Sequence, residues 1–271
     1  MGAVYRKHPK QAHPVPSLSV RTHHPAPGFD PRGLSIDCLL WCRADAGVEE
    51  NGSGVSGWED MSGNSNDLAQ ATASAQPALE VGGLGGRPEL TFDGSNDVLT
   101  GPSLYGMLSA DDEWTIALIV RDWTWGTAIN ATWGTAYARG ALSAPSGGGS
   151  YLDLAAGDSS DGLCSGYYDG TTPAEVGFPP AAGSQGAASV WVTVCDGANL
   201  TCRINGSAGA TDTDGGGLHS NATTLGVGRG SSSGGFWDGA ISEVLIFDGV
   251  LSAEELGILE DYMLDRYEVS P

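Results

Sequence analysis

The sequence predicts an all-β fold: a sandwich of β-strands with one C-terminal helix and an extended N-terminal arm. Its 271 residues include 42 glycines and 14 prolines, a share that is typical of many short strands joined by turns. From Asp37 onward, short apolar runs are separated by Gly, Asn, Asp and Ser. Because this length suits a single large β-sandwich, we expect one domain over 37–271, preceded by an arm over 1–36.

The arm is predicted from its composition. Residues 1–36 hold six of the 14 prolines and four of the five histidines, with scarcely any apolar periodicity. Proline fixes φ and removes a backbone donor, so this stretch should be extended and unable to form a core of its own. A disordered tail and a segment held by neighbouring subunits are both consistent with such a composition.

Charge is spread unevenly along the chain. The formal net charge is −21; five basic side chains against one acid give residues 1–36 a charge of +4, which leaves −25 for 37–271. So acidic a body repels nucleic acid, and no nucleic-acid partner is expected. The arm is instead expected to bind acidic surfaces of partner proteins, through Tyr5, Arg6, Lys7, Lys10, Arg21 and Arg32.

Signals for a membrane or for secretion are missing from the sequence. No apolar run approaches the ~18–20 residues of a membrane span, and the N-terminus lacks the apolar core of a secretory signal. We therefore expect no membrane partner and a protein made and first kept in a cytoplasm. The five cysteines lack CxxC spacing and are expected to be reduced and packed, with Cys195 and Cys202 as the one plausible local pair.

The first strands follow from their apolar patterns. Residues 38–42 form the first strand candidate, and 114–120 are apolar on both faces, as expected for a strand buried centrally between layers. Residues 190–195 and 200–204 are joined by Asp196-Gly197-Ala198-Asn199, whose residue types favour a turn. This segment is therefore predicted to be a β-hairpin.

The later part of the chain contains both clear and weak strand patterns. Two further strands are predicted at 224–228 and 241–247. Residues 140–186 are rich in Gly, Ser, Ala and Pro, and we expect long loops there with weak strands around 151–154 and 163–168.

One helix is predicted at about 252–266. Ser252 and Glu255 have the spacing of a capping box, and acids in the first turn suit the positive end of the helix dipole. The apolar residues at helical spacing are Leu256, Leu259, Met263 and Tyr267. This stripe must lie on another surface, so we expect the helix to pack on the flank of the sandwich.

Several stretches resemble a known family. LWCRAD (40–45), VSGWEDMSGNSND (55–67) and RPELTFDGSNDVL (87–99), followed by DGAISEVLIFD (238–248) and the helix segment, occur in this order in laminin-G-like domains of the concanavalin A-like lectin/glucanase superfamily. The similarity spans roughly 37–267 and is weak over 126–186. It implies a jelly-roll sandwich of two antiparallel sheets, a scaffold that hosts lectins, glycosidases, adhesion modules and phage virion proteins.

The matching residues are expected to build the fold. Trp41 and Trp58 have the size to fill a sandwich core. Asp and Asn between glycines, as in the segment 93–96, favour turns because they bond their own backbone.

Catalytic residues are not predicted. Glycosidases need two carboxyl groups about 5–10 Å apart, and the glucanases of this superfamily alternate their acids along one strand. Here Glu59 and Asp60 are adjacent and should point to opposite faces, while Glu243 stands alone on its strand. A Cys–His site would have to use His219, the one histidine of the body, in a Gly/Ser loop. We therefore expect that the protein is not an enzyme.

Two kinds of binding site have candidates. Asp212 and Asp214 could bind calcium, as could the acidic loop at 158–162, but acidic loops are also expected in so acidic a body; no other cofactor is expected. Trp123, Trp125 and Trp133 lie close together after the central strand and could offer an aromatic platform to a sugar. Alternatively, they cover an edge of the sandwich or a subunit contact.

Three functional hypotheses remain. The first, drawn from the resemblance and the arm, is a phage virion structural protein: a capsid decoration or cement protein on the virion surface, assembled in the host cytoplasm. Its arm would bind capsid or other virion proteins, and it would be a homo-oligomer in the assembly. The alternative is a carbohydrate-binding adhesin or lectin-like module on a fibre or cell-surface protein, with a surface glycan as its partner. A glycan-active enzyme would require paired acids that the sequence does not show.

Overall fold

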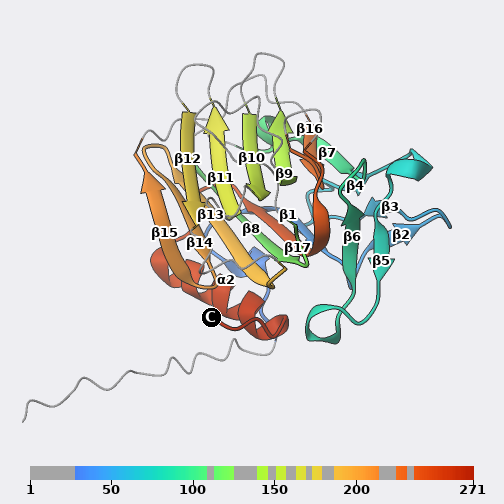
Figure 1. Ribbon diagram of the computed structural model, residues 1–271. Coiled ribbons are helices and arrows are strands. Elements are labelled where there is room, and N and C mark those ends of the chain that lie inside the picture. The colour runs from blue at the N-terminus through green and yellow to red at the C-terminus, as the bar shows by residue number, and fades with distance from the viewer. Residues whose placement is uncertain are drawn as a thin grey trace, which may run out of the picture.

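The computed structural model describes residues 28–108, 113–124, 139–145, 151–156, 163–168, 173–178, 186–213, 224–230 and 235–271. Within these residues the strands form two antiparallel sheets, which pack face to face (Figure 1). One long helix lies near the C-terminus. The predicted all-β sandwich with a single C-terminal helix is confirmed. None of the helices in these ranges is long and apolar enough to cross a membrane.

The first sheet has eight strands in the described part of the chain. In spatial order these are β15 (Ser207–Asp212), β14 (Leu200–Ile204), β13 (Ser189–Asp196), β8 (Glu113–Arg121), β17 (Asp238–Phe247), β6 (Glu89–Asp93) and β5 (Ala78–Glu80). The eighth strand, β1 (Cys38–Arg43), also pairs with β17. The predicted hairpin is confirmed as β13 and β14, whose turn is closed by Asp196 Oδ1 accepting from Asn199 N at 2.7 Å.

The second sheet has nine strands among the described residues. In order these are β12 (Pro173–Phe178), β11 (Leu163–Tyr168), β10 (Tyr151–Ala156), β9 (Arg139–Pro145), β16 (Thr224–Val227), β7 (Leu99–Ser103), β4 (Leu68–Ala69), β3 (Val55–Trp58) and β2 (Val48–Glu50). Figure 1 shows β2 to β6 gathered at one end of the sandwich and β12 and β15 at the other. The connections contain short helical turns: η1 (Pro31–Gly33), η2 (Ala73–Ala75), η3 (Leu84–Gly86) and α1 (Leu104–Met107).

Strand β8 is central because it faces two apolar layers. Ile116 and Leu118 point into the core between the sheets. Ala117 and Ile119 point to the opposite side and pack beneath the C-terminal helix. This alternation explains why residues 114–120 are apolar on both faces of the strand, with Thr115 as the one polar residue. Of the two tryptophans expected in the core, Trp58 is buried between the sheets, whereas Trp41 is buried under the helix.

The C-terminal helix is α2 (Ala253–Arg266), as predicted. Its capping box is complete, with Ser252 Oγ accepting from Glu255 N at 3.3 Å and Glu255 Oε2 accepting from Ser252 N at 3.0 Å. Leu259, Met263 and Tyr267 are fully buried against the first sheet. The apolar stripe therefore anchors α2 on the flank of the sandwich.

The boundary predicted at residue 36 is too late. Phe29 packs on Tyr262 of α2 with ring centroids 4.5 Å apart, and Ile36 packs in the same apolar layer. In addition, Ser35 N donates to Glu255 Oε1 at 2.7 Å. Residues 29–36 thus belong to the folded body, because their apolar side chains have a helix surface to cover. Residues 1–27 lie outside the described residues.

The segment after β3 explains one of the family stretches. Asp60 is buried, and its Oδ1 accepts from Trp41 N at 2.9 Å while its Oδ2 accepts from Ser62 Oγ at 2.7 Å and from Asn66 N at 3.0 Å. Asn66 Nδ2 in turn donates to Leu39 O at 2.8 Å. These polar side chains tie the β3–β4 connection to β1, so the stretch serves the fold.

The weak strands expected around 151–154 and 163–168 are confirmed as β10 and β11, whereas the expectation of loops is wrong at β9 and β12. Four successive strands, β9 to β12, pair in order within this range. Gly and Ala have low strand propensity, so the local sequence pattern did not indicate β9 and β12. Tertiary packing stabilises the strands, since Leu142, Leu152 and Leu154 are fully buried in the core between the sheets.

Cys38, Cys42, Cys195 and Cys202 are buried. Cys202 is a free thiol, so the local pair with Cys195 is not formed. Burial raises the pKa of Cys202 to about 12 and raises the pKa of the Cys38 and Cys42 thiols. These three thiols are therefore protonated at neutral pH and are poor nucleophiles.

Candidate functional site

The predicted aromatic platform is not found at Trp123. This side chain is fully buried, stacks on Trp237 with ring centroids 6.5 Å apart and donates from Nε1 to Ala187 O at 3.2 Å. It covers the end of β8 inside the fold, so it cannot present a face to a sugar. Trp125 and Trp133 lie outside the described residues.

The candidate calcium ligands are only partly described. Asp212 ends β15, whereas Asp214 and the acidic loop at 158–162 lie outside the described residues. Across the described ranges, no three His, Cys, Asp or Glu side chains are grouped so that they could hold a metal ion. Calcium binding at these loops therefore stays a prediction.

Of the six residues expected to bind partners, the structure describes Arg32. Its guanidinium pairs with Asp30 at 2.6 Å and lies over the Trp41 ring at 5.7 Å from the centroid. Arg32 thus also fastens the residues before β1 to the body. The other five, Tyr5, Arg6, Lys7, Lys10 and Arg21, precede the described residues.

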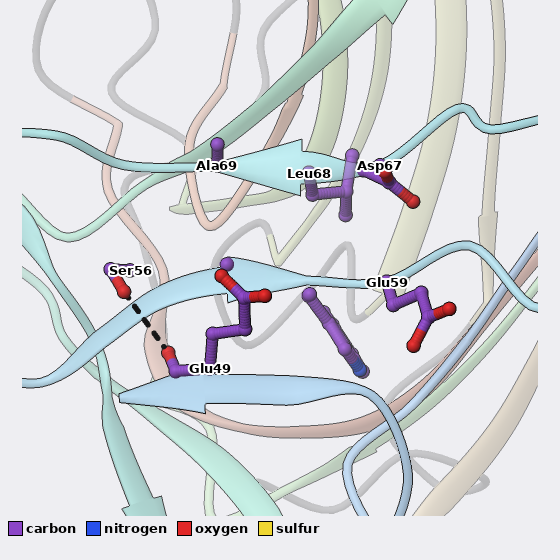
Figure 2. A pocket seen from close by; sticks show the side chains of 8 residues that line it. Glu49, Ser56, Glu59, Asp67, Leu68 and Ala69 are labelled. Atoms are coloured by element: carbon purple, nitrogen blue, oxygen red, sulfur yellow. Dashed lines mark hydrogen bonds between the residues drawn. The ribbon is translucent and has the colours of Figure 1, made fainter. Parts of the chain in front are cut away.

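A cavity of about 450 Å³ lies on the second sheet, where β2, β3 and β4 run side by side (Figure 2). Its lining residues are Glu49, Ser56, Gly57, Trp58, Glu59, Asp67, Leu68 and Ala69. Trp58 and Leu68 belong to the core between the sheets. Because side chains alternate along a strand, their neighbours Gly57, Glu59, Asp67 and Ala69 face outward, away from that core.

Two glycines make room for the carboxylates of this cavity. A Cβ on Gly57 would stand 3.0 Å from Glu49 Oε2, so the Glu49 side chain lies over the bare backbone of β3. A Cβ on Gly47, whose φ is +68°, would stand 2.6 Å from the Cβ of Glu59. Figure 2 shows Glu49 and Glu59 on neighbouring segments of the chain at this cavity.

The cavity offers mainly hydrogen-bond acceptors. Asp67 Oδ1 accepts from Asp60 N at 2.8 Å, which fixes the Asp67 carboxylate. Ser56 Oγ donates to Glu49 O at 3.3 Å. No Lys, Arg or His lines the cavity, and ionised Glu and Asp are acceptors only. Such a lining suits hydroxyl groups of a ligand and disfavours an anion.

The cavity is one end of a row that crosses the outer face of the second sheet. Direct cross-strand partners project on the same side of a sheet, and here each residue in the row pairs with the next. The row runs Glu49, Gly57, Ala69, Thr100, Gly226, Ser143 and Asp153. Leu142, Ala144, Leu225 and Val227, the sequence neighbours of Ser143 and Gly226, face the core. The row therefore faces outward.

Side chains along the middle of this row are small. Gly57, Ala69 and Gly226 leave the backbone uncovered by their own side chains. From Glu49 to Ser143 the row crosses five inter-strand steps, or roughly 24 Å at about 4.8 Å a step. The face thus combines an acceptor-rich cavity at one end with accessible positions at Ala69 and Thr100, whereas Gly226 and Ser143 farther along the row are buried.

The acidic residues that were weighed as catalytic candidates lie in different parts of the fold. Glu59 lines the cavity while Asp60 is buried and bonded to β1, which agrees with the expectation that they point to opposite sides. Glu243 is fully buried under α2, where it accepts from Trp41 Nε1 at 2.7 Å and from Tyr262 Oη at 3.0 Å. Burial raises its pKa. Glu243 is therefore part of the helix anchor.

Sequence reasoning missed Glu49 and the row. The local signal at β2 was weak, because Val48-Glu49-Glu50 is a strand of three residues beside an Asn-Gly turn. Only the pairing of β2 with β3 and of β3 with β4 shows that Glu49, Glu59 and Asp67 share one cavity.

Comparisons with known proteins agree with this architecture. A family model described as the concanavalin A-like lectin/glucanases superfamily matches residues 93–257. No curated protein matches the sequence. Domain 4 of an extracellular arabinanase from Geobacillus stearothermophilus, solved in complex with arabinotriose, has a TM-score of 0.58 at 13% identity. That match covers 83% of this chain and 98% of the domain.

Two toxin domains are also similar in structure. The binding domain of Paraclostridial mosquitocidal protein 1 has a TM-score of 0.59 at 12% identity, over 84% of this chain and 53% of that one. The binding domain of botulinum neurotoxin serotype D has a TM-score of 0.55 at 12% identity, over 85% and 52%. The matches thus cover about half the length of these two toxin domains. At such identities the likeness shows a common fold.

Proposed function

Because this chain belongs to the concanavalin A-like lectin/glucanases superfamily, we propose that it is a non-catalytic carbohydrate-binding domain whose ligand lies on the outer face of the second sheet. The observation that carries the proposal is the cavity of Glu49, Glu59 and Asp67, which opens onto a row of small side chains. Sugars present many hydroxyl donors, and carboxylate acceptors form stronger hydrogen bonds than neutral ones.

The structural neighbours support this proposal. The arabinanase domain that matches most of this chain was solved with an arabinose oligosaccharide bound, and the toxin domains are binding domains. The fold alone does not determine a function, so the main support for carbohydrate binding is the lining of the cavity. Its volume of about 450 Å³ and its lining of acidic and uncharged residues suit a neutral stretch of an oligosaccharide.

A glycan array followed by calorimetric titration tests the proposal. We expect neutral oligosaccharides to bind, and Glu49→Ala and Glu59→Ala each to weaken binding by about 1.5 kcal/mol, or roughly tenfold, because each removes a charged acceptor. Glu50→Ala is the matched control: it is exposed on the same strand and does not line the cavity. No binding to any glycan, or equal binding by all variants, would contradict the proposal.

The non-catalytic part of the proposal has its own test. Incubation with a bound oligosaccharide should release no new reducing ends over a day. Release that disappears in Glu49→Ala or Glu59→Ala would instead establish a glycosidase, since such enzymes require a pair of carboxyl groups.

We also propose that the basic residues before 28 tether this domain to a phage particle, as a decoration protein on the virion surface. The charge contrast supports it: +4 over 1–36 against −25 over 37–271. Exposed ion pairs are weak singly and are screened by salt, so attachment should be salt-sensitive. Deletion of residues 2–27 should leave the circular dichroism spectrum unchanged and abolish co-sedimentation with particles; retained co-sedimentation would refute the tether.

A further inference from the structure

Arg229 differs from the other arginines that the structure describes. Ion pairs within the chain are made by Arg32, Arg43, Arg87, Arg121, Arg139, Arg203 and Arg266. Among these described arginines, Arg229 alone makes none. In a chain of net charge −21, acids are abundant, so an arginine that makes no ion pair is an unexpected feature.

The Arg229 side chain lies on the outer face of the second sheet. A Cβ on Gly226 would stand 3.4 Å from Arg229 Cγ and Nε, and 3.4 Å from Ser143 Oγ. Gly226 faces outward because its neighbours Leu225 and Val227 are in the core. The guanidinium stem therefore crosses the bare backbone at Gly226 and lies beside Ser143, in the row that begins at the cavity.

Two polar atoms at this point have no hydrogen-bond partner. Arg229 Nε and Ser143 Oγ are both buried and unsatisfied, and Ser143 has 0% of its surface exposed. Buried polar groups are nearly always paired. Arg229 Nε can only donate a hydrogen bond, so its missing partner is an acceptor, and the Ser143 hydroxyl can donate to the same acceptor. Arg229 keeps part of its surface exposed, so a ligand would approach the site at Arg229, because Ser143 itself is closed to solvent.

The backbone holds this position firmly. Gly228 N donates to Ala141 O at 2.8 Å, and Gly230 N donates to Gly235 O at 2.7 Å, one on each side of Arg229. Arg229 itself forms a bridge with Phe236. The donors are thus preorganised before a ligand arrives, which lowers the entropy lost on binding.

We propose that Arg229 and Ser143 bind the carboxylate of an acidic sugar residue, a site that rests on the proposed carbohydrate-binding function. A guanidinium presents parallel N–H donors that match the two oxygens of a carboxylate. The Ser143 hydroxyl adds a further donor beside them. The site supplies positive charge where the cavity at Glu49 supplies only acceptors.

The two positions together define the ligand class. Glu49 and Gly226 are four inter-strand steps apart, or roughly 19 Å. Carboxylates at the cavity repel a second acid, whereas Arg229 attracts one. The preferred ligand is therefore an oligosaccharide with an acidic residue at one end and neutral residues along the rest, and a uniformly acidic polymer should bind less well.

The nearest acid of the row provides an internal check. Asp153 pairs with Ser143 across β9 and β10, is buried, and has an interaction of its own within the chain. Its negative charge opposes a bound carboxylate. Asp153→Asn should therefore strengthen binding of an acidic sugar, the opposite sign to the loss of Arg229.

NMR titration with methyl glucuronide and methyl glucoside tests the site, because these probes differ only in the carboxylate. We expect the glucuronide to bind about tenfold more tightly and to shift the amide resonances of Gly226 and Ser143. Arg229→Gln should abolish the difference, and Arg229→Lys should keep part of it. Arg87→Gln, at an ion-paired arginine, is the control and should leave the difference intact.

The outcomes separate this inference from the proposed function. Equal binding of the two probes, or a preference that survives in Arg229→Gln, overturns the acidic subsite; if Glu49→Ala still weakens neutral oligosaccharides, the carbohydrate function stands. Failure of every sugar, neutral or acidic, overturns both. If Arg229→Gln unfolds, Ser143→Ala carries the test, and a preference as large as that of the wild type would then refute the site.

Discussion

The buried carboxylate of Glu243 gives a sharp test of how α2 is held on the sandwich. Glu243 has 0% of its surface exposed and accepts from Trp41 Nε1 at 2.7 Å and from Tyr262 Oη at 3.0 Å. Arg266 Nε lies 4.0 Å from Glu243 Oε2. Glu243→Ala leaves two buried donors without an acceptor, one on β1 and one on α2.

The expected loss follows from those two donors. Each buried unsatisfied group costs about 1–3 kcal/mol, so Glu243→Ala should lower the free energy of unfolding by about 2–6 kcal/mol. A loss of about 3 kcal/mol in the free energy of unfolding corresponds to a fall in Tm of roughly 6–12 °C for a domain of this size. Glu243→Gln keeps one acceptor oxygen and removes the burial of a charge, so its loss should be clearly smaller.

Urea denaturation and calorimetry measure both variants. Glu50→Ala, an exposed acid on β2, serves as the control and should change stability by no more than about 0.5 kcal/mol. The reasoning would be refuted if Glu243→Ala stayed within that limit, or if Glu243→Gln were the more destabilising of the two. Either result would mean that the donors find other partners when the carboxylate is removed.

Other positions give independent predictions. Burial raises the pKa of Asp97 to about 6. Because the native state then holds a proton that the unfolded chain has released, this group's contribution to stability falls as pH rises from about 4 to 6. Asp97→Asn should therefore flatten that part of a stability–pH curve measured by urea titration. Ser252→Ala removes the cap of α2 and should lower the free energy of unfolding by about 1 kcal/mol in calorimetry. Gly257 has open space around its Cα within α2, so Gly257→Ala should raise Tm, with a gain of up to about 1 kcal/mol. A Cβ on Gly140 would overlap the backbone of Gly230, so Gly140→Ala should lower Tm strongly. An unchanged Tm would show that the backbones of Gly140 and Gly230 leave room for a methyl group.

Much of the fold followed from local patterns whose tertiary context agrees with them. The successive apolar residues of β8 predicted burial on both faces, which the core and α2 provide. Asp93 Oδ1 accepts from Ser95 N at 2.8 Å, so the expected turn forms by the expected mechanism. Where propensity opposed context, as in β9 with its Gly and Ser residues, the prediction failed because pairing with β10 and β16 decides the structure.

The site could not be predicted in the same way. Its row joins residues as far apart in the chain as Glu49 and Gly226, which only the order of the strands brings onto one face. Trp123 misled for the converse reason: its neighbours suggested an exposed pair of indoles, but Trp237 from a distant segment covers it. An unpaired arginine such as Arg229 gives no signal in the sequence, because the three-dimensional arrangement determines whether an acid lies close enough to pair with it.

Residues 29–36 enter the body against α2, on the side of the first sheet, whereas the cavity opens on the outer face of the second sheet. Two packed sheets, themselves about 10 Å apart, lie between these positions. The proposed partner of the preceding chain and the proposed glycan on the opposite face could therefore bind simultaneously without competing. In that arrangement the cavity faces away from the partner, and saturating one side should leave the affinity of the other unchanged.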